Sequence, residues 1–308
     1  MESITNTTPL GVSRRSFLQR AGIASVATAA ITAGAGLITG ANTAYGLHTS
    51  SDVDILNFAL NLEYLEAEFY WYAVYGSSIT TAGVNVSGTG TPGGVTIKSS
   101  PQVMFTRDRI RQYAIEIAND EKNHVKALRA TITSLGGTPA ARPAINLRES
   151  FNTLAAAAGI GPAFDPFLSD KNFLLAAFIF EDVGVTAYKG AARYIDNPDV
   201  LEAAAGILAV EAYHAGNIRS QLSTLVIQEG LQDITSTVEK ISNLRDTLDG
   251  TGDTDQALFL GGKANIVPAD ASGLAYSRTS RQVLNIVYGA PNATKGLFFP
   301  AGLNGAVK

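Results

Sequence analysis

Two short motifs hold the residues best suited to chemistry. Glu121 stands three positions before His124, and Glu211 stands three positions before His214. Positions i and i+3 of a helix share one face, so each motif would present a carboxylate beside an imidazole. Carboxylate and imidazole together suit Fe or Mn, and Zn is also able to bind them. The chain has three histidines in all, so two of the three fall in this pattern.

A second pattern repeats together with the first. Glu63 is followed seven positions later by Tyr70, and Glu181 is followed seven positions later by Tyr188. The chain therefore contains two copies of one unit, in which a Glu-x6-Tyr segment precedes a Glu-x-x-His segment. The two glutamates of a unit are 58 positions apart in the first copy and 30 apart in the second. An insertion at residues 77–100 accounts for most of that difference.

This repeat predicts a dinuclear metal centre. In a four-helix bundle, one inward glutamate from each of two helices and a Glu-x-x-His motif from each of the others supply four carboxylates and two imidazoles. Four buried carboxylates repel one another and take up protons unless cations neutralise them, and two divalent ions would do so. We expect the two glutamates outside the motifs to bridge the ions. The predicted metal ligands are Glu63, Glu121, His124, Glu181, Glu211 and His214.

The sequence leaves three alternatives to this assignment open. The Glu-x-x-His motifs are also compatible with an exposed polar face that binds nothing. Glu66 lies one helical turn after Glu63 and is able to replace it as a ligand. Tyr70 and Tyr188 are expected in the core, where they either only pack or also donate a hydrogen bond to a metal ligand. No catalytic residue beyond the metal centre itself is indicated.

Apolar periodicity predicts an all-α chain. The expected helix caps are Ser51 or Asp52, Ser169 or Asp170, and Asn197 before Pro198. Ser100-Pro101 has the form of a helix start, and residues 77–100 are expected to form a long loop or a small hairpin. These elements predict an antiparallel four-helix bundle at 51–249, with an additional helix, and a long irregular C-terminal tail at 250–308 that packs on it. The expected helices are 52–76, 101–136, 148–158, 169–194, 198–230, 231–248 and 281–288.

The N-terminus has the features of an export signal. Ser13-Arg14-Arg15-Ser16-Phe17-Leu18 is a twin-arginine motif, and an uncharged segment rich in Ala, Gly and Thr follows from Ala21 to Leu47. This resembles a twin-arginine (Tat) signal, so residues 1–50 are predicted to direct the protein to the periplasm or cell envelope. A retained membrane anchor is the alternative, because the segment is long enough to span a bilayer. The mature domain is not expected to span the membrane.

Composition excludes several other functions. The chain of 308 residues has no cysteine, which removes disulfides, thiol nucleophiles, Fe–S clusters and Cys-ligated zinc. The formal net charge of −4 and the lack of a basic block argue against a nucleic-acid partner. The expected partner is instead a small oxidant such as peroxide or dioxygen, and self-association into a homo-oligomer is compatible with the sequence.

The chain resembles a known family. Its glutamate and histidine set looks like the di-metal site of the ferritin-like superfamily, which includes ferritins, rubrerythrins and manganese catalases. The segment Leu60–Tyr70 (LNLEYLEAEFY) and tail segments such as Gln282–Tyr288 (QVLNIVY) and Phe299–Gly305 (FPAGLNG) are similar to the ferritin-like, desiccation-related proteins. The resemblance covers nearly all of residues 52–308.

This resemblance implies a ferritin-like fold and a function in stress protection. The leading hypothesis is an exported protein with two Fe or Mn ions that reacts with peroxide or dioxygen. The alternative is a non-catalytic desiccation or stress protein of the envelope, whose metal site is structural or vestigial. The sequence does not separate Fe from Mn chemistry within the first hypothesis.

Overall fold

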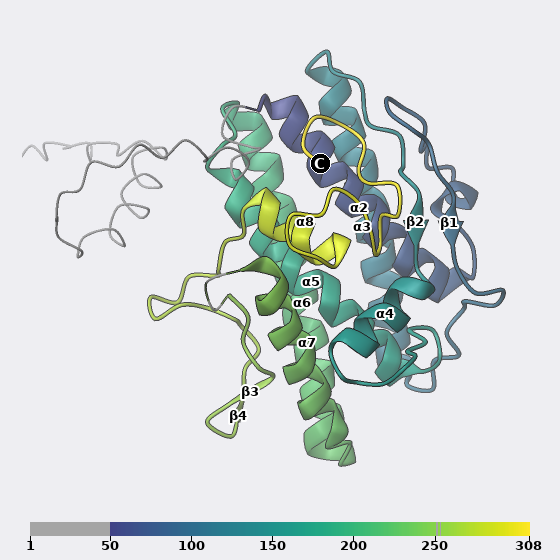
Figure 1. Cartoon of the computed structure of the whole chain (residues 1–308), viewed down its shortest axis with the longest axis vertical. Coiled ribbons are helices and arrows are strands. Elements are labelled where there is room, and N and C mark those ends of the chain that lie inside the picture. The colour runs from purple at the N-terminus through teal and green to yellow at the C-terminus, as the bar shows by residue number, and fades with distance from the viewer. Residues whose placement is uncertain (1–49, 251, 253) are drawn as a thin grey trace, which may run out of the picture. The chain divides into compact units, whose positions relative to one another are not determined.

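Four long helices form the main body of the chain. The computed structural model describes residues 50–250, 252 and 254–308, so the predicted export signal at 1–50 lies, apart from its last residue, outside the described residues. The helices lie side by side as a bundle (Figure 1), and the all-α prediction is confirmed. Their bounds are α2 Asp52–Tyr75, α3 Asp108–Ser134, α5 Asp170–Ala192 and α6 Pro198–Glu229.

Three of these helices begin at the capping residues that the sequence indicates. The Ser51 side chain accepts a hydrogen bond from the backbone N–H of Asp54, and Asp54 completes a capping box at the start of α2. The Ser169 side chain caps α5, and Asn197 caps α6 with Pro198 in its first turn. These caps fix where each helix starts, and therefore which residues reach the bundle interior.

The start of α3 differs from the prediction. The helix begins at Asp108 instead of following Ser100-Pro101. The segment between them is held by tertiary hydrogen bonds: the Val103 N–H donates to the Ala73 carbonyl, and the Thr106 N–H donates to the Asp170 carboxylate. Because these N–H groups are already bonded to other parts of the chain, the local helix-start signal does not decide the conformation.

The insertion at residues 77–100 is a loop that pairs with a later part of the chain. It contains a 3-10 helix, η1 Ile79–Ala82, and a two-residue strand, β1 Val95–Thr96. β1 pairs in parallel with β2 Ile145–Asn146, in the connection that leads to α4 Glu149–Ala157, so the hairpin alternative is wrong. β3 Phe259–Leu260 and β4 Lys263–Ala264 form a second small ladder, which is antiparallel.

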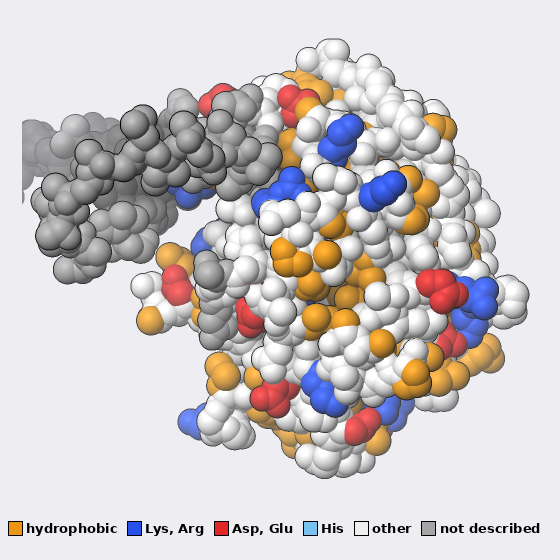
Figure 2. All heavy atoms as spheres, viewed as in Figure 1, with side chains coloured by type: hydrophobic (Ala, Val, Ile, Leu, Met, Phe, Trp, Pro, Cys, Tyr) orange, Lys and Arg blue, Asp and Glu red, His pale blue; other side chains and the backbone are white. Residues whose placement is uncertain are grey.

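The C-terminal part of the chain lies against the bundle. α7 Asp233–Asp249 follows α6, and α8 Ser280–Tyr288 packs against both α5 and α7 (Figure 1). The last loop is fastened to α2: the Asn304 N–H donates to the Asn61 side chain at 3.0 Å, and the Asn61 amide donates to the Asn304 carbonyl at 2.8 Å. On the face with α8, apolar side chains gather near the centre and charged ones are scattered around them (Figure 2).

A buried network of charges joins α5 to α6, α7 and the tail. Asp182 on α5 accepts hydrogen bonds from Arg219 at 3.0 and 2.7 Å and from Arg245 at 3.0 Å. Asp255 pairs with both Arg245 and Arg278. Each of these five side chains is at most 6% exposed, so the network fixes the position of α5 from inside the protein.

No helix within the described residues is both long and apolar enough to cross a membrane.

Substitution of Asp182 tests this network. Asp182→Asn removes the charge that Arg219 and Arg245 share, and breaking a buried ion pair costs about 3–5 kcal/mol of unfolding free energy. Asp108→Asn is the control, because its ion pair with Arg111 lies on an exposed surface and should change stability by less than about 1 kcal/mol. Chemical denaturation measures both values. Equal losses in the two variants would contradict a structural function for the network.

Candidate metal centre

The six predicted ligands converge between the four long helices. Glu63 comes from α2, Glu121 and His124 from α3, Glu181 from α5, and Glu211 and His214 from α6. All six side chains are buried, and none is more than 7% exposed. The alternative that the Glu-x-x-His motifs form an exposed polar face is therefore wrong.

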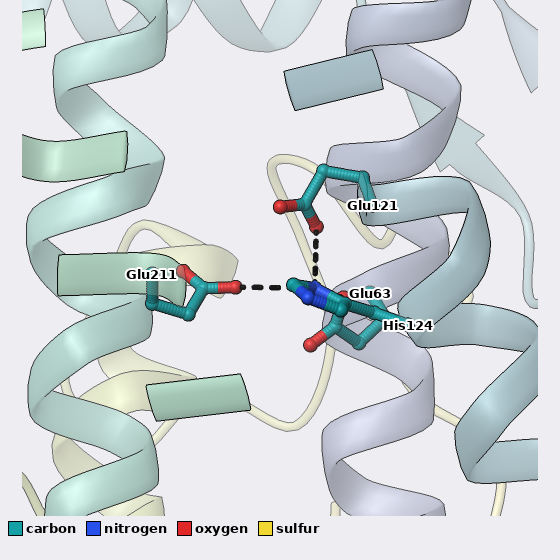
Figure 3. Close-up of side chains that lie close together, drawn as sticks. All are labelled: Glu63, Glu121, His124 and Glu211. Carbon is teal, nitrogen blue, oxygen red and sulfur yellow. Dashed lines mark ion pairs between the residues drawn. The ribbon is translucent and has the colours of Figure 1, made fainter. Parts of the chain in front are cut away.

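The first cluster surrounds His124. Its Nδ1 atom lies 3.3 Å from Oε2 of Glu63, 3.6 Å from Oε2 of Glu121 and 3.8 Å from Oε1 of Glu211. Figure 3 shows Glu121 and Glu211 pointing toward the imidazole from two different helices. One ligand atom from each of the four residues lies within 4.8 Å of the others, which is close enough to share one ion.

The second cluster surrounds His214. Its Nδ1 atom lies 3.1 Å from Oε1 of Glu121 and 3.5 Å from Oε2 of Glu181. Its other ring nitrogen, Nε2, lies 3.2 Å from Oδ2 of Asp120. The two histidine rings are 6.3 Å apart between centroids, so the two clusters are adjacent.

The geometry adds candidates to the glutamates that are expected to bridge. Glu121 directs one carboxylate oxygen toward each histidine, and Glu211 belongs both to the His124 cluster and to a group with Glu181. Glu63 and Glu181 each approach a single histidine, and Glu181 also belongs to two of the groups. The expectation that Glu63 and Glu181 bridge stays a prediction, and Glu121 is a further candidate because it faces both histidines.

Glu66 is part of the same constellation. One of its ligand atoms lies within 4.8 Å of those of Glu181 and Glu211. Gly184 is the position in the second repeat that corresponds to Glu66, and a Cβ atom there would lie 2.2 Å from Oε2 of Glu211. The sequence analysis considers Glu66 as an alternative ligand to Glu63, whereas the structure places both residues at the centre. The glycine at position 184 of the second repeat already indicates, in the sequence, that the two repeats differ at this point.

Tyr70 and Tyr188 each donate a hydrogen bond to a glutamate of the other repeat. The Tyr70 hydroxyl donates to Oε1 of Glu181, and the Tyr188 hydroxyl donates to Oε1 of Glu63. Burial, together with the carboxylate that each phenol faces, raises the pKa of both tyrosines well above its usual range, so they remain neutral donors. Each tyrosine therefore orients one glutamate so that the Oε2 atom of that glutamate faces a histidine.

Unpaired polar atoms mark the centre as suited to cations. Nine buried oxygen and nitrogen atoms here have no hydrogen-bond partner. Buried polar atoms without partners are costly, so a cluster of them on carboxylates and imidazoles fits a site that binds metal ions. They are Glu63 Oε2, Glu66 Oε2, both Glu121 oxygens, His124 Nδ1, Glu181 Oε2, both Glu211 oxygens and His214 Nδ1.

Without a metal, protons must neutralise these groups. Burial raises the pKa of Glu63 to about 7, although His124 partly offsets the effect. Burial would lower the pKa of His124, but the Glu63 carboxylate and Glu121 raise it to about 12. Burial and the charge of Glu121 raise the pKa of Glu211 well above its usual range. Metal ions would have to displace such protons in order to bind.

The fold and the centre together define a class of protein. A four-helix bundle with one inward glutamate on each of two helices and Glu-x-x-His on each of the other two is the ferritin-like di-metal arrangement. A ferritin-like domain family matches residues 51–224. The chain belongs to this ferritin-like family, and its similarity to a desiccation-related protein places it with the desiccation-related members.

Two curated relatives cover most of the chain. The desiccation-related protein PCC13-62 of Craterostigma plantagineum is 33% identical over an alignment of 249 positions, and the match covers 76% of this chain and 76% of the relative. The ferritin-like catalase Nec2 of Nesocodon mauritianus is 28% identical over an alignment of 273 positions, and the match covers 83% of this chain and 85% of the relative.

Removing one tyrosine hydroxyl should weaken metal binding. Tyr70→Phe leaves Glu181 without its donor, and loss of a group that orients a ligand typically costs about 10–100-fold in metal affinity. Tyr113→Phe, a partly buried tyrosine of α3 outside the centre, is the control. Competition with a chelator measures both affinities. Equal affinities in the two variants would argue against an orienting function for Tyr70.

Metal affinity should increase with pH. His124, with a pKa of about 12, and Glu63, with a pKa of about 7, hold protons that an ion has to displace. These protons compete more strongly as the pH falls, so binding should strengthen steadily from about pH 5 to about pH 8. Calorimetry in two buffers of different protonation enthalpy should show net proton release. Binding that is independent of pH, with no proton released, would contradict this expectation.

Proposed function

We propose that this chain is a di-metal carboxylate protein with Fe or Mn that reacts with peroxide or dioxygen and protects against stress. The observation that carries the proposal is the set of nine buried carboxylate and imidazole atoms between four helices that have no hydrogen-bond partner among the described residues. Eight of these atoms belong to the six side chains that we propose as ligands, and the ninth belongs to Glu66. The similarity to a relative named ferritin-like catalase supports reaction with peroxide.

Different side chains would bind the ions and orient the ligands at such a centre. Bound Fe or Mn supplies the redox chemistry. Glu121 and Glu211 lie where they could hold both ions together, and Glu63 and Glu181 each face one histidine. Tyr70 and Tyr188 fix the orientation of Glu181 and Glu63 through hydrogen bonds. The apolar bundle around these groups limits the access of water.

The twin-arginine sequence at Ser13–Leu18 extends the proposal to location. We place the mature protein in the periplasm or cell envelope, after export by the Tat route. The second candidate is a non-catalytic stress protein with a structural metal site, and the relative named desiccation-related protein favours it.

Loss of one central carboxylate should abolish the centre. Glu121→Gln removes the oxygen charge that faces both histidines, so we expect fewer than two ions per chain and loss of peroxide consumption. Glu116→Gln, an exposed glutamate of α3, is the matched control and should retain both. Elemental analysis of protein from its own host, followed by a peroxide assay after loading with Fe or Mn, measures the result.

The same experiment separates the two candidates. Two ions per chain with turnover support the enzyme, and stoichiometric metal without turnover supports the structural site. Unmodified protein that binds no metal from its host or from solution would contradict both candidates.

A further inference from the structure

A cavity extends away from the candidate metal centre between the helices. It has a volume of about 40 Å³ and lies between α2, α5 and α8. Its wall includes Glu63, Glu66 and Gly184 at the centre and, farther along, Ile55 and Ile195. A second cavity, lined by residues such as Phe151 and Ile241, has none of the candidate ligands in its wall.

The cavity is long relative to its volume. Glu66 and Ile55 are eleven residues apart on α2, which is about 16 Å at the rise of an α-helix. Gly184 on α5 and Ile195 just beyond its end are also eleven residues apart. A cavity needs about 10–15 Å³ for each water-sized molecule, so this one accommodates only a short row of very small molecules.

Its walls offer almost no hydrogen bonds. The lining residues are apolar except for Glu63, Glu66 and Tyr188, all of which lie at the centre itself. A peroxide molecule or an anion would have to give up its water before it reached these groups, which is unfavourable. A small apolar molecule loses little in the same passage.

The outer part of the cavity reaches toward solvent. Ala191 and Ile195 are partly exposed, whereas Gly184 and Glu66 at the inner end are buried. The face that bears α8 also carries apolar side chains near its middle (Figure 2). The passage is therefore apolar except at its inner end, where Glu63, Glu66 and Tyr188 lie.

The inner end depends on the missing side chain at Gly184, which leaves room for the Glu211 carboxylate. A Cβ atom at Gly184 would lie 2.2 Å from Oε2 of Glu211 and 3.7 Å from Oε1 of Glu66. Oε2 of Glu66 has no hydrogen-bond partner. The cavity thus meets the centre beside Glu66, the carboxylate that has no counterpart in the second repeat.

We propose that this cavity is the entry and binding site for small, uncharged molecules that form few hydrogen bonds, the class to which dioxygen belongs. This inference deepens the proposed function and rests on it for the presence of metal. The apolar lining favours dioxygen over peroxide as the molecule that reaches the centre through this cavity. The lining also excludes anions, and the small volume excludes larger organic substrates.

Xenon tests the cavity without any metal. Crystals of the metal-free protein under xenon pressure should show xenon between α2, α5 and α8, because xenon is apolar and small. Ala187→Leu fills the cavity wall one turn from Gly184 and should abolish the xenon site. Ala192→Leu is the matched control on the same helix, since Ala192 does not line the cavity. Absence of xenon from the unmodified protein would overturn the proposal.

Ligand binding to the Fe(II)-loaded protein tests the route. Nitric oxide, which is neutral, should bind about tenfold more slowly in Ala187→Leu than in Ala192→Leu, with equal iron content in both. Azide, which is an anion, should show no such difference. Ala191→Leu replaces Ala187→Leu if the latter does not fold. Equal rates of nitric oxide binding in Ala187→Leu and Ala192→Leu would overturn the proposal. If the protein binds xenon but takes up no iron, the cavity assignment stands and the proposed metal function is refuted.

Discussion

Five carboxylates packed into an apolar interior impose the constraint that shapes this protein. Glu63, Glu66, Glu121, Glu181 and Glu211 are each at most 7% exposed and face one another within a small volume. The charged form of a buried carboxylate is unfavourable unless opposite charge lies beside it. Within the part of the chain that the structure describes, two imidazoles lie among these carboxylates, so the remaining charge has to be balanced by protons or by cations from outside.

The neighbouring residue shows that the fold is able to neutralise a carboxylate completely. Asp182 follows Glu181 directly, and two buried arginines, Arg219 and Arg245, hold it through three hydrogen bonds. Among the described residues, Glu181 accepts a hydrogen bond from a tyrosine hydroxyl and lies near a histidine, but it faces no arginine or lysine in any of these contacts. One side of α5 is thus fixed by internal ion pairs, while the other side keeps carboxylate oxygens available. The ion pairs of Asp182 hold α5 in position, and this keeps Glu181 at the metal centre.

The sequence predicted what depends on local spacing and missed what depends on tertiary contacts. Helix starts at Ser51, Ser169 and Asn197 follow from side chains that cap their own helix, and the ligand set follows from a repeat within the chain. The predicted start of α3 was wrong because the backbone N–H groups of Val103 and Thr106 donate hydrogen bonds to distant parts of the chain. The spacing of i and i+3 also did not show that Glu121 faces both histidines, because it does not encode the direction of a carboxylate between helices.

The duplicated unit also explains why the two halves of the centre are unequal. A perfect repeat would give both ions the same surroundings, but two positions break it. Glu66 in the first copy corresponds to Gly184 in the second, and Asp120, which lies 3.2 Å from Nε2 of His214, corresponds to Val210. A carboxylate behind a histidine raises its basicity as a ligand. The His214 side therefore has both an additional carboxylate in Glu66 and a more basic imidazole, so two ions bound here would differ in coordination even if they were the same metal.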